Sequence, residues 1–382
     1  MEKCRHNVTR VKNTREDKEN DTERETIDYT DWRQGGSPAG NGSPVSGLLA
    51  EEFCEGMTDI EAFEHFGMDA AIMCWPLDRA VMDSADWRVE STVLRSEPEM
   101  RIRHTITTPE GELSYITEAT PMTVYVVEHL VKNPDDIRLI EKYMPNPTLD
   151  VGYVKQAKER LGDGGILRGT LPYHQGGVWQ DACEFFGTEN MIMAGIDNPD
   201  WVHEFMRILM EKKLRFVEDE MKDAPYDPVE NGRGAASSTV ISPKFFEEYT
   251  IKYDKKVHEA LHEKGYKVVY HTCGGMIPIC EMIVQNGCDA SETLSPSGVG
   301  GDADEPSVIK EKIGNKVCLI GELDQFNILT NGTAEDIRKE VFRLFEQAGQ
   351  GGEYMISAAD HFFETPPENL QTCADAVKEC IY

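Results

Sequence analysis

Apolar and polar residues alternate along two stretches between residues 91 and 117, and a short turn separates the two stretches. Ile102 and Ile106 share one phase of this alternation before the turn at residues 109–111, and Leu113 and Tyr115 continue it afterwards. A period of two places alternate side chains on one face of a strand, and Pro and Gly in the break favour a tight connection. The pattern therefore predicts a β-hairpin.

Beyond the hairpin, short apolar runs alternate with longer amphipathic stretches. Residues 267–270 are β-branched or aromatic, as in a buried strand, and the amphipathic stretch before them begins at Ser242-Pro243, a favourable helix start, and ends at Gly265. Such alternation over most of the chain is typical of a parallel α/β fold, and the length fits a (β/α)8 TIM barrel. We expect this barrel over residues 51–382, with the hairpin as an insertion and residues 1–50 as an irregular N-terminal arm.

In such a barrel, the side chains that do chemistry lie at the carboxyl ends of the strands. Polar and titratable residues follow the predicted strands one after another along the chain. In chain order they are Arg168, His174, Glu230, Asn231, Arg233, His271, Cys273, Glu292, Glu322, Asp324, Asp360 and His361. The sequence therefore predicts a site at this rim of the barrel.

His271 and Cys273 form the sharpest pair on the rim. They are two residues apart at the end of one predicted strand, so their side chains project from the same face, and Gly274-Gly275 ends the strand. Imidazole and thiolate are ligands that zinc prefers. The alternative is a hydrogen-bonded rim histidine beside a packed loop thiol. A third ligand is required, and spacing leaves Asp360, His361, Glu322 and Glu292 open.

Charge and composition narrow the classes of partner. The chain carries 39 Lys and Arg against 69 Asp and Glu, a formal net charge of -30, which disfavours nucleic acid as a partner. No run approaches 18 apolar residues and the N-terminus lacks an apolar signal segment, so we expect no membrane association and a cytoplasmic location. The ten cysteines are scattered, as expected for reduced thiols. A homodimer is compatible with the sequence.

Four segments carry a resemblance to a known family: residues 270–276 (YHTCGGM), 286–293 (NGCDASET), 318–324 (CLIGELD) and 357–369 (SAADHFFETPPEN). They resemble the uroporphyrinogen decarboxylase superfamily, and within it the corrinoid-dependent methyltransferase branch. The resemblance implies a TIM barrel, a zinc ion bound by His-x-Cys and usually a later cysteine, and a corrinoid (cobalamin) carried by a separate partner protein. His271 and Cys273 match the first pair. The later cysteine is missing from residues 357–363, so an oxygen ligand is expected instead.

These considerations give one set of assigned roles. We expect zinc on His271, Cys273 and Asp360, acid–base chemistry from Glu292, His361 and Glu322, and substrate contacts from His174, Asn231, Arg233 and Asp324. The function expected is methyl transfer between a small methylated substrate, such as a methoxylated aromatic that loses its O-methyl group, and the cobalt of the partner corrinoid.

Two other functions remain open. One is metal-free decarboxylation of a polycarboxylate. For this function the rim offers few basic residues, mainly Arg168 and Arg233. The other is a non-catalytic, ligand-binding barrel. Metal content and turnover discriminate between the three functions.

Overall fold

A curled parallel sheet forms the centre of the protein. The computed structural model describes residues 57–78, 83–120, 123–173, 176–360 and 365–381. Seven parallel strands run in the order β1 (Ala70–Met73), β8 (Gly165–Thr170), β9 (Pro228–Gly232), β10 (Lys267–His271), β11 (Ala290–Thr293), β12 (Cys318–Leu323) and β13 (Tyr354–Ala358). This order is the chain order of a βα repeat, and it confirms the predicted parallel α/β class.

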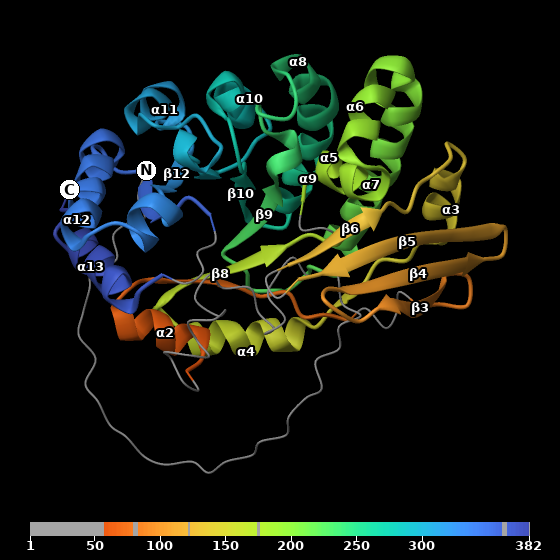
Figure 1. The fold of residues 1–382 in the computed structure, drawn as a ribbon, viewed down its shortest axis with the longest axis horizontal. Helices are drawn as coiled ribbons and strands as arrows, with labels where there is room; N and C mark the ends of the chain where they lie inside the picture. The colour runs from red at the N-terminus through yellow and green to blue at the C-terminus, as the bar shows by residue number, and fades with distance from the viewer. Residues whose placement is uncertain (1–56, 79–82, 121–122, 174–175, 361–364, 382) are drawn as a thin grey trace, which may run out of the picture.

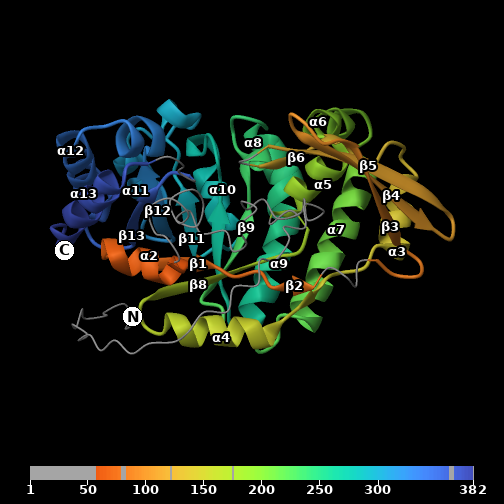
Figure 2. The ribbon, with the colours of Figure 1, turned by 60° about the horizontal axis from the view of Figure 1, so that its bottom comes forward.

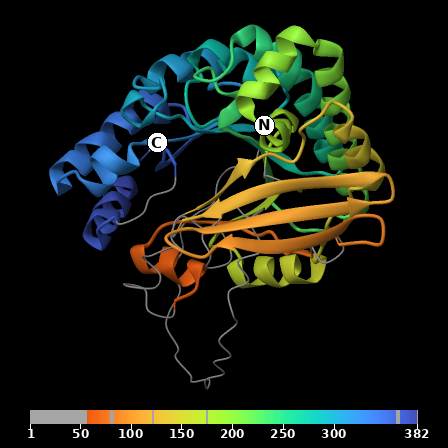
Figure 3. The same ribbon diagram turned by 45° about the vertical axis from the view of Figure 1, so that its right-hand side comes forward.

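Helices cover the outer side of this sheet. Those that follow the strands form an arc (Figure 3), and α2 and α4 pack beside β1 and β8 (Figure 2). The α-helices are α2 (Asp59–Phe66), α3 (Asp136–Tyr143), α4 (Val151–Leu161), α5 (Val178–Phe186), α6 (Thr188–Asp197), α7 (Pro199–Asp219), α8 (Pro243–Phe246), α9 (Lys252–Glu263), α10 (Cys280–Gln285), α11 (Pro306–Ile313), α12 (Ala334–Leu344) and α13 (Pro367–Lys378).

The helix that was predicted to begin at Ser242 shows how local sequence sets an element. The Ser242 side chain accepts a hydrogen bond from the Phe245 amide, and Pro243 occupies the first turn. α8 continues through a π-helical segment, Glu247–Ile251, into α9, and Gly265 follows with φ of 91°. The predicted boundaries are therefore confirmed, with a π-helical segment that the apolar period did not reveal.

A second sheet lies at one end of the molecule (Figure 1). It is antiparallel, in the order β3 (Arg88–Arg95), β4 (Met100–Thr108), β5 (Gly111–Ala119) and β6 (Val124–Glu128). β4 and β5 pair from Thr108 and Gly111 outward, at the turn where the hairpin was predicted. Two short strands, β2 (Leu77–Asp78) and β7 (Thr148–Leu149), pair separately.

One side-chain contact across the parallel sheet is evidence that the sheet is curved. Arg168 on β8 lies 2.7 Å from Glu292 on β11, although β9 and β10 stand between these strands. In a flat sheet, three strand spacings would separate the α-carbons of the two residues by about 14 Å. The contact between the tips of their side chains therefore indicates that the sheet curls toward this face. Within the described residues β1 and β13 are its edges and do not pair, so the closed eight-stranded ring remains a prediction.

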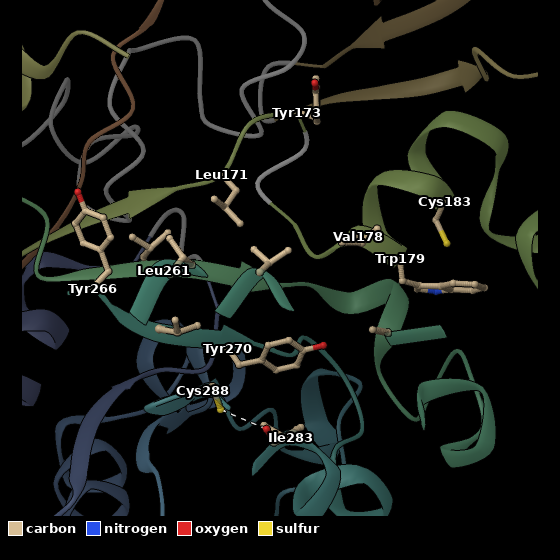
Figure 4. Close-up of a cluster of buried hydrophobic side chains, with 14 of the residues drawn as sticks. Leu171, Tyr173, Val178, Trp179, Cys183, Leu261, Tyr266, Tyr270, Ile283 and Cys288 are labelled. Carbon is tan, nitrogen blue, oxygen red and sulfur yellow. Dashed lines mark hydrogen bonds between the residues drawn. The ribbon is translucent and has the colours of Figure 1, made fainter. Parts of the chain in front are cut away.

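The two faces of the central strands have different surroundings. Tyr270, next to His271 on β10, points to the opposite face and lies in the buried apolar cluster that also contains Leu261 and Ile283 (Figure 4). The concave face holds the charged side chains. The predicted arm, residues 1–50, lies outside the described residues. No described helix is both long and apolar enough to cross a membrane.

Candidate metal centre

Strand β10 ends at His271, and Cys273, the other residue that the sequence singled out, lies two residues further along the loop. His271 Nε2 lies 2.6 Å from Cys273 Sγ, and Cys273 Sγ lies 3.3 Å from Asp360 Oδ2. The three donor atoms lie within 4.8 Å of one another. His271 is buried, and Cys273 and Asp360 are half-buried. Residues 87 positions apart in the chain therefore converge on one point.

Glycines allow the chain to bring these residues together. Gly232, at the end of β9, has φ of 112°, and a Cβ there would lie 2.4 Å from the backbone oxygen of His271. Gly274 also has φ of 112°, and a Cβ there would lie 2.8 Å from Ser237 Oγ. A side chain at either position would strain the backbone and crowd the loop. These two glycines hold β9 and the loop after β10 close together around the cluster.

The other nitrogen of the imidazole faces a carboxylate. His271 Nδ1 lies 2.8 Å from Glu292 Oε1, and His271 and Glu292 are paired neighbours on adjacent strands. A carboxylate only accepts hydrogen bonds, so Nδ1 carries the hydrogen and Nε2 faces Cys273. A carboxylate on the far nitrogen is the usual support of a metal-binding histidine. The donor set and its support therefore fit a zinc ion.

Arg168 neutralises the carboxylates of this face. Its Nη2 atom lies 2.7 Å from Glu292 Oε1 and 2.9 Å from Glu230 Oε2, and Glu230 Oε1 lies 3.9 Å from His271 Nδ1. Burial alone would raise the pKa of Glu292, but Arg168 and His271 outweigh burial and hold that pKa well below its usual range. Glu292 is therefore ionised.

The electrostatics at His271 favour a cation at Nε2. Burial lowers the pKa of His271, but the facing Cys273 sulfur and the carboxylates of Glu292 and Glu230 outweigh burial and raise that pKa well above 6.5. The same negative surroundings that favour a proton on the ring favour a metal ion beside it.

Arg233, predicted as a substrate contact, lies beside this cluster. Its Nη2 atom is 3.6 Å from Glu230 Oε1, and its backbone amide donates to His271 O at 2.7 Å. Its Nε atom is buried and has no hydrogen-bond partner among the described residues.

Two other predicted site residues, Asn231 and Asp324, point away from the cluster. Asn231 Nδ2 lies 2.7 Å from His258 Nε2 on α9, on the outer face of the sheet. Asp324 accepts from the amides of Phe326 and Asn327, which caps the segment after β12. Neither contact brings these side chains to the cluster.

Glu322 also points away from the cluster, toward α12. Alternation along β12 would place it on the concave face, but Gly321 and Glu322 have φ of 130° and 85°, and these angles break the alternation. Its Oε1 atom instead lies 3.5 Å from Arg343 Nη2. The other two predicted residues, His174 and His361, lie outside the described residues.

Two residues of the cluster received no role from the sequence. Arg168 and Glu230 were placed at the rim, but Asn231 was chosen over Glu230. The register holds the missing signal, because His271 pairs with Gly232 and strand alternation then puts Glu230 on the same face as His271 and Asn231 on the opposite face.

Comparisons with known proteins show which family the chain resembles. The family model described as uroporphyrinogen decarboxylase (URO-D) matches residues 111–380. The methylcobamide:CoM methyltransferases MtbA of Methanosarcina acetivorans and Methanosarcina mazei are 25% and 26% identical to the chain over 270 and 274 residues, and each alignment covers 67% of this chain and 72% of the relative.

A solved structure supports the fold. A methyltransferase from Methanosarcina mazei superimposes with a TM-score of 0.56 and 16% sequence identity, and the alignment covers 84% of this chain and 83% of the other. At this identity the likeness concerns the fold alone.

Proposed function

The chain belongs to the uroporphyrinogen decarboxylase family, and from that membership we propose that it is a zinc-dependent methyltransferase. It moves a methyl group between a small molecule and the cobalt of a corrinoid held by a separate protein. The observation that carries the proposal is the convergence of His271, Cys273 and Asp360 within 4.8 Å. The similarity to proteins named methylcobamide:CoM methyltransferases supports the reaction class.

The ligand set follows from the donor atoms. Nε2 of His271, Sγ of Cys273 and one carboxylate oxygen of Asp360 would hold the ion, which leaves a position open for the small molecule. Bound there, zinc supplies a Lewis acid for the sulfur, oxygen or nitrogen atom that gains or loses the methyl group. Cys273 must give up its thiol proton to act as a ligand, so loading the site releases a proton.

The chain's own carboxylates handle protons around the site. Glu292 keeps the hydrogen of His271 on Nδ1, which reserves Nε2 for the ion. Glu230 Oε1 is buried and makes no hydrogen bond to any residue that the structure describes, so we place on it the acceptance of a proton from a bound substrate. We therefore place general acid–base chemistry on Glu230 rather than on Glu322, which lies against Arg343.

Two classes of small molecule suit this site. A methoxylated aromatic would donate its O-methyl group to the corrinoid, and an oxygen ligand at Asp360 matches an oxygen substrate in hardness. A thiol would accept a methyl group from the corrinoid, and the names of the two Methanosarcina relatives describe that direction. Arg233 lies where it can contact either molecule.

The competing decarboxylase mechanism requires cations that are free to bind substrate carboxylates. Arg168 is already paired with Glu230 and Glu292, and Arg233 lies 3.6 Å from Glu230. The described part of the site therefore offers a polycarboxylate little uncompensated positive charge, which favours the methyltransferase.

Metal analysis of the purified protein tests the site. We expect about one zinc per chain when no chelator is used, and loss of most of that zinc in Cys273→Ala, because one ligand of a small set is removed. Cys380→Ala, which removes another half-buried thiol far along the chain, is the matched control and should keep the metal. A metal-free wild type, or equal zinc in both variants, contradicts the proposal.

A methyl-transfer assay then separates an enzyme from a binding protein. Free cob(I)alamin is offered with methoxylated aromatics, and methylcobalamin with thiols including coenzyme M, while the cobalamin spectrum is followed. We expect turnover in one direction that Cys273→Ala abolishes. The opposite outcome is a protein that binds zinc and turns over no member of the panel, even with its corrinoid partner supplied. That result would favour the non-catalytic barrel.

A further inference from the structure

Arg168 is half-buried on the concave face and touches two carboxylates from two different strands. Its Nη2 atom lies 2.9 Å from Glu230 on β9 and 2.7 Å from Glu292 on β11. His271, on β10 between them, lies 2.8 Å from Glu292. The guanidinium thus connects β8 to β9 and β11, and the hydrogen bond between Glu292 and His271 adds β10.

We propose that Arg168 is a positioning residue for the metal centre, acting on His271 through Glu292. This inference rests on the zinc site of the proposed function. Arg168 does not itself face the proposed ion, yet it contacts the same oxygen of Glu292 that receives the Nδ1 hydrogen of His271. It therefore determines how firmly the imidazole presents Nε2 to the ion.

The argument depends on what Glu292 does without its counter-charge. One ring nitrogen of His271 and one carboxylate oxygen each of Glu230 and Glu292 lie within 4.8 Å of one another. Without Arg168, two buried carboxylates would face each other at close range, and like charges at that distance repel. Glu292 would turn away from Glu230, and it would then hold His271 less firmly. Supporting residues of this kind typically change metal affinity 10- to 100-fold.

Arginine suits this position better than lysine. A planar guanidinium directs its N–H groups to two carboxylates at once, whereas an ammonium group is a point charge on a flexible stem. Arg168→Lys should therefore give a zinc affinity between those of the wild type and Arg168→Met.

A double-mutant cycle on zinc affinity tests the inference. Zinc dissociation constants are measured by competition with a coloured chelator for the wild type, Arg168→Met, Glu292→Gln and the double variant. We expect each single variant to bind zinc 10- to 100-fold more weakly, and the double variant to bind no more weakly than Glu292→Gln, because Arg168 acts through Glu292.

Two further measurements separate positioning from general damage. Arg343→Met, which removes a guanidinium paired with Glu340 and Glu322 on the outer side, should leave zinc affinity within about threefold of the wild type. With cobalt(II) in place of zinc, the thiolate-to-cobalt absorption band should keep its position in Arg168→Met at saturating metal. That result would show an unchanged ligand set bound with lower affinity.

The outcomes separate this inference from the proposal on which it rests. A wild type that binds no zinc contradicts the metal site itself. A wild type that binds zinc, with Arg168→Met binding equally well, overturns the role of Arg168, and so do fully additive losses in the cycle. If Arg168→Met does not fold, the same cycle is run with Arg168→Lys, for which wild-type affinity overturns the inference.

Discussion

Glu292 and Glu322 are both buried carboxylates at strand ends, yet their surroundings shift their pKa values in opposite directions. Burial raises both pKa values, but Glu292 has Arg168 at 2.7 Å and His271 at 2.8 Å, and these two groups reverse the shift. Glu322 has Arg343 at 3.5 Å, with Glu340 and Asp304 nearby, and burial raises its pKa from 4.5 to about 9. The charge of Glu292 is therefore set by its neighbours, and that of Glu322 by burial.

The raised pKa of Glu322 makes a prediction about stability. Between pH 4.5 and about 9 the folded protein holds a proton on Glu322 that the unfolded chain releases, so this residue's contribution to stability falls as the pH rises through that range. Glu322→Gln imitates the protonated side chain. We expect the variant to be more stable than the wild type at pH 7, by up to about 3 kcal/mol in the free energy of unfolding.

Urea unfolding at several pH values checks this prediction. The advantage of Glu322→Gln should grow from pH 5 to pH 8, whereas Glu311→Gln, at an exposed position on α11, should stay within about 0.5 kcal/mol of the wild type throughout. A Glu322→Gln variant that is less stable than the wild type at pH 7 would show that Glu322 is held as a charged partner of Arg343.

At the scale of elements, strand alternation explains both what the sequence revealed and what it concealed. His271 and Cys273 could be placed together because they are two residues apart at and just beyond the end of β10, where side chains at i and i+2 project the same way. Glu322 could not be placed correctly, because the positive φ angles at Gly321 and Glu322 leave no apolar signature in the sequence. The choice of Asn231 over Glu230 depended on the register of β9 against β10, which no single strand contains.

A buried histidine on the outer face of β9 and β10 leads to a second prediction about how stability depends on pH. On α9, His258 is buried, donates from Nδ1 to the Asn286 carbonyl and accepts at Nε2 from Asn231. Burial lowers the pKa of His258 from 6.5 to about 4. The unfolded chain therefore binds a proton between these pH values that the folded protein excludes, so stability is lost as the pH falls through this window, at up to about 1.4 kcal/mol per pH unit.

Replacement of His258 isolates this effect. His258→Gln should be less stable than the wild type at pH 7, by about 1 to 3 kcal/mol, because buried hydrogen bonds are lost. Its stability should fall less steeply from pH 6.5 to pH 4. His65→Gln, at an exposed position on α2, is the control and should keep the wild-type slope. Equal slopes in wild type and His258→Gln would mean that His258 is not the group responsible.

At the scale of the whole molecule, the curl of the sheet creates the site. Repeated strand and helix patterns were sufficient to predict the parallel α/β class, because each element carries its own period. The contact between Arg168 and Glu292 spans strands that are far apart in sequence and depends on sheet curvature, which no local pattern encodes. The same holds for Asp360, which reaches Cys273 from the far end of the chain.

X-ray absorption at the zinc edge of the loaded protein measures the ligand set most directly. The geometry of His271, Cys273 and Asp360 predicts one sulfur at about 2.3 Å, with the remaining ligands nitrogen or oxygen at about 2.0 to 2.2 Å. Asp360→Cys should raise the number of sulfur ligands to two. A wild-type spectrum with two sulfur ligands, or with none, would contradict a centre built from these three residues.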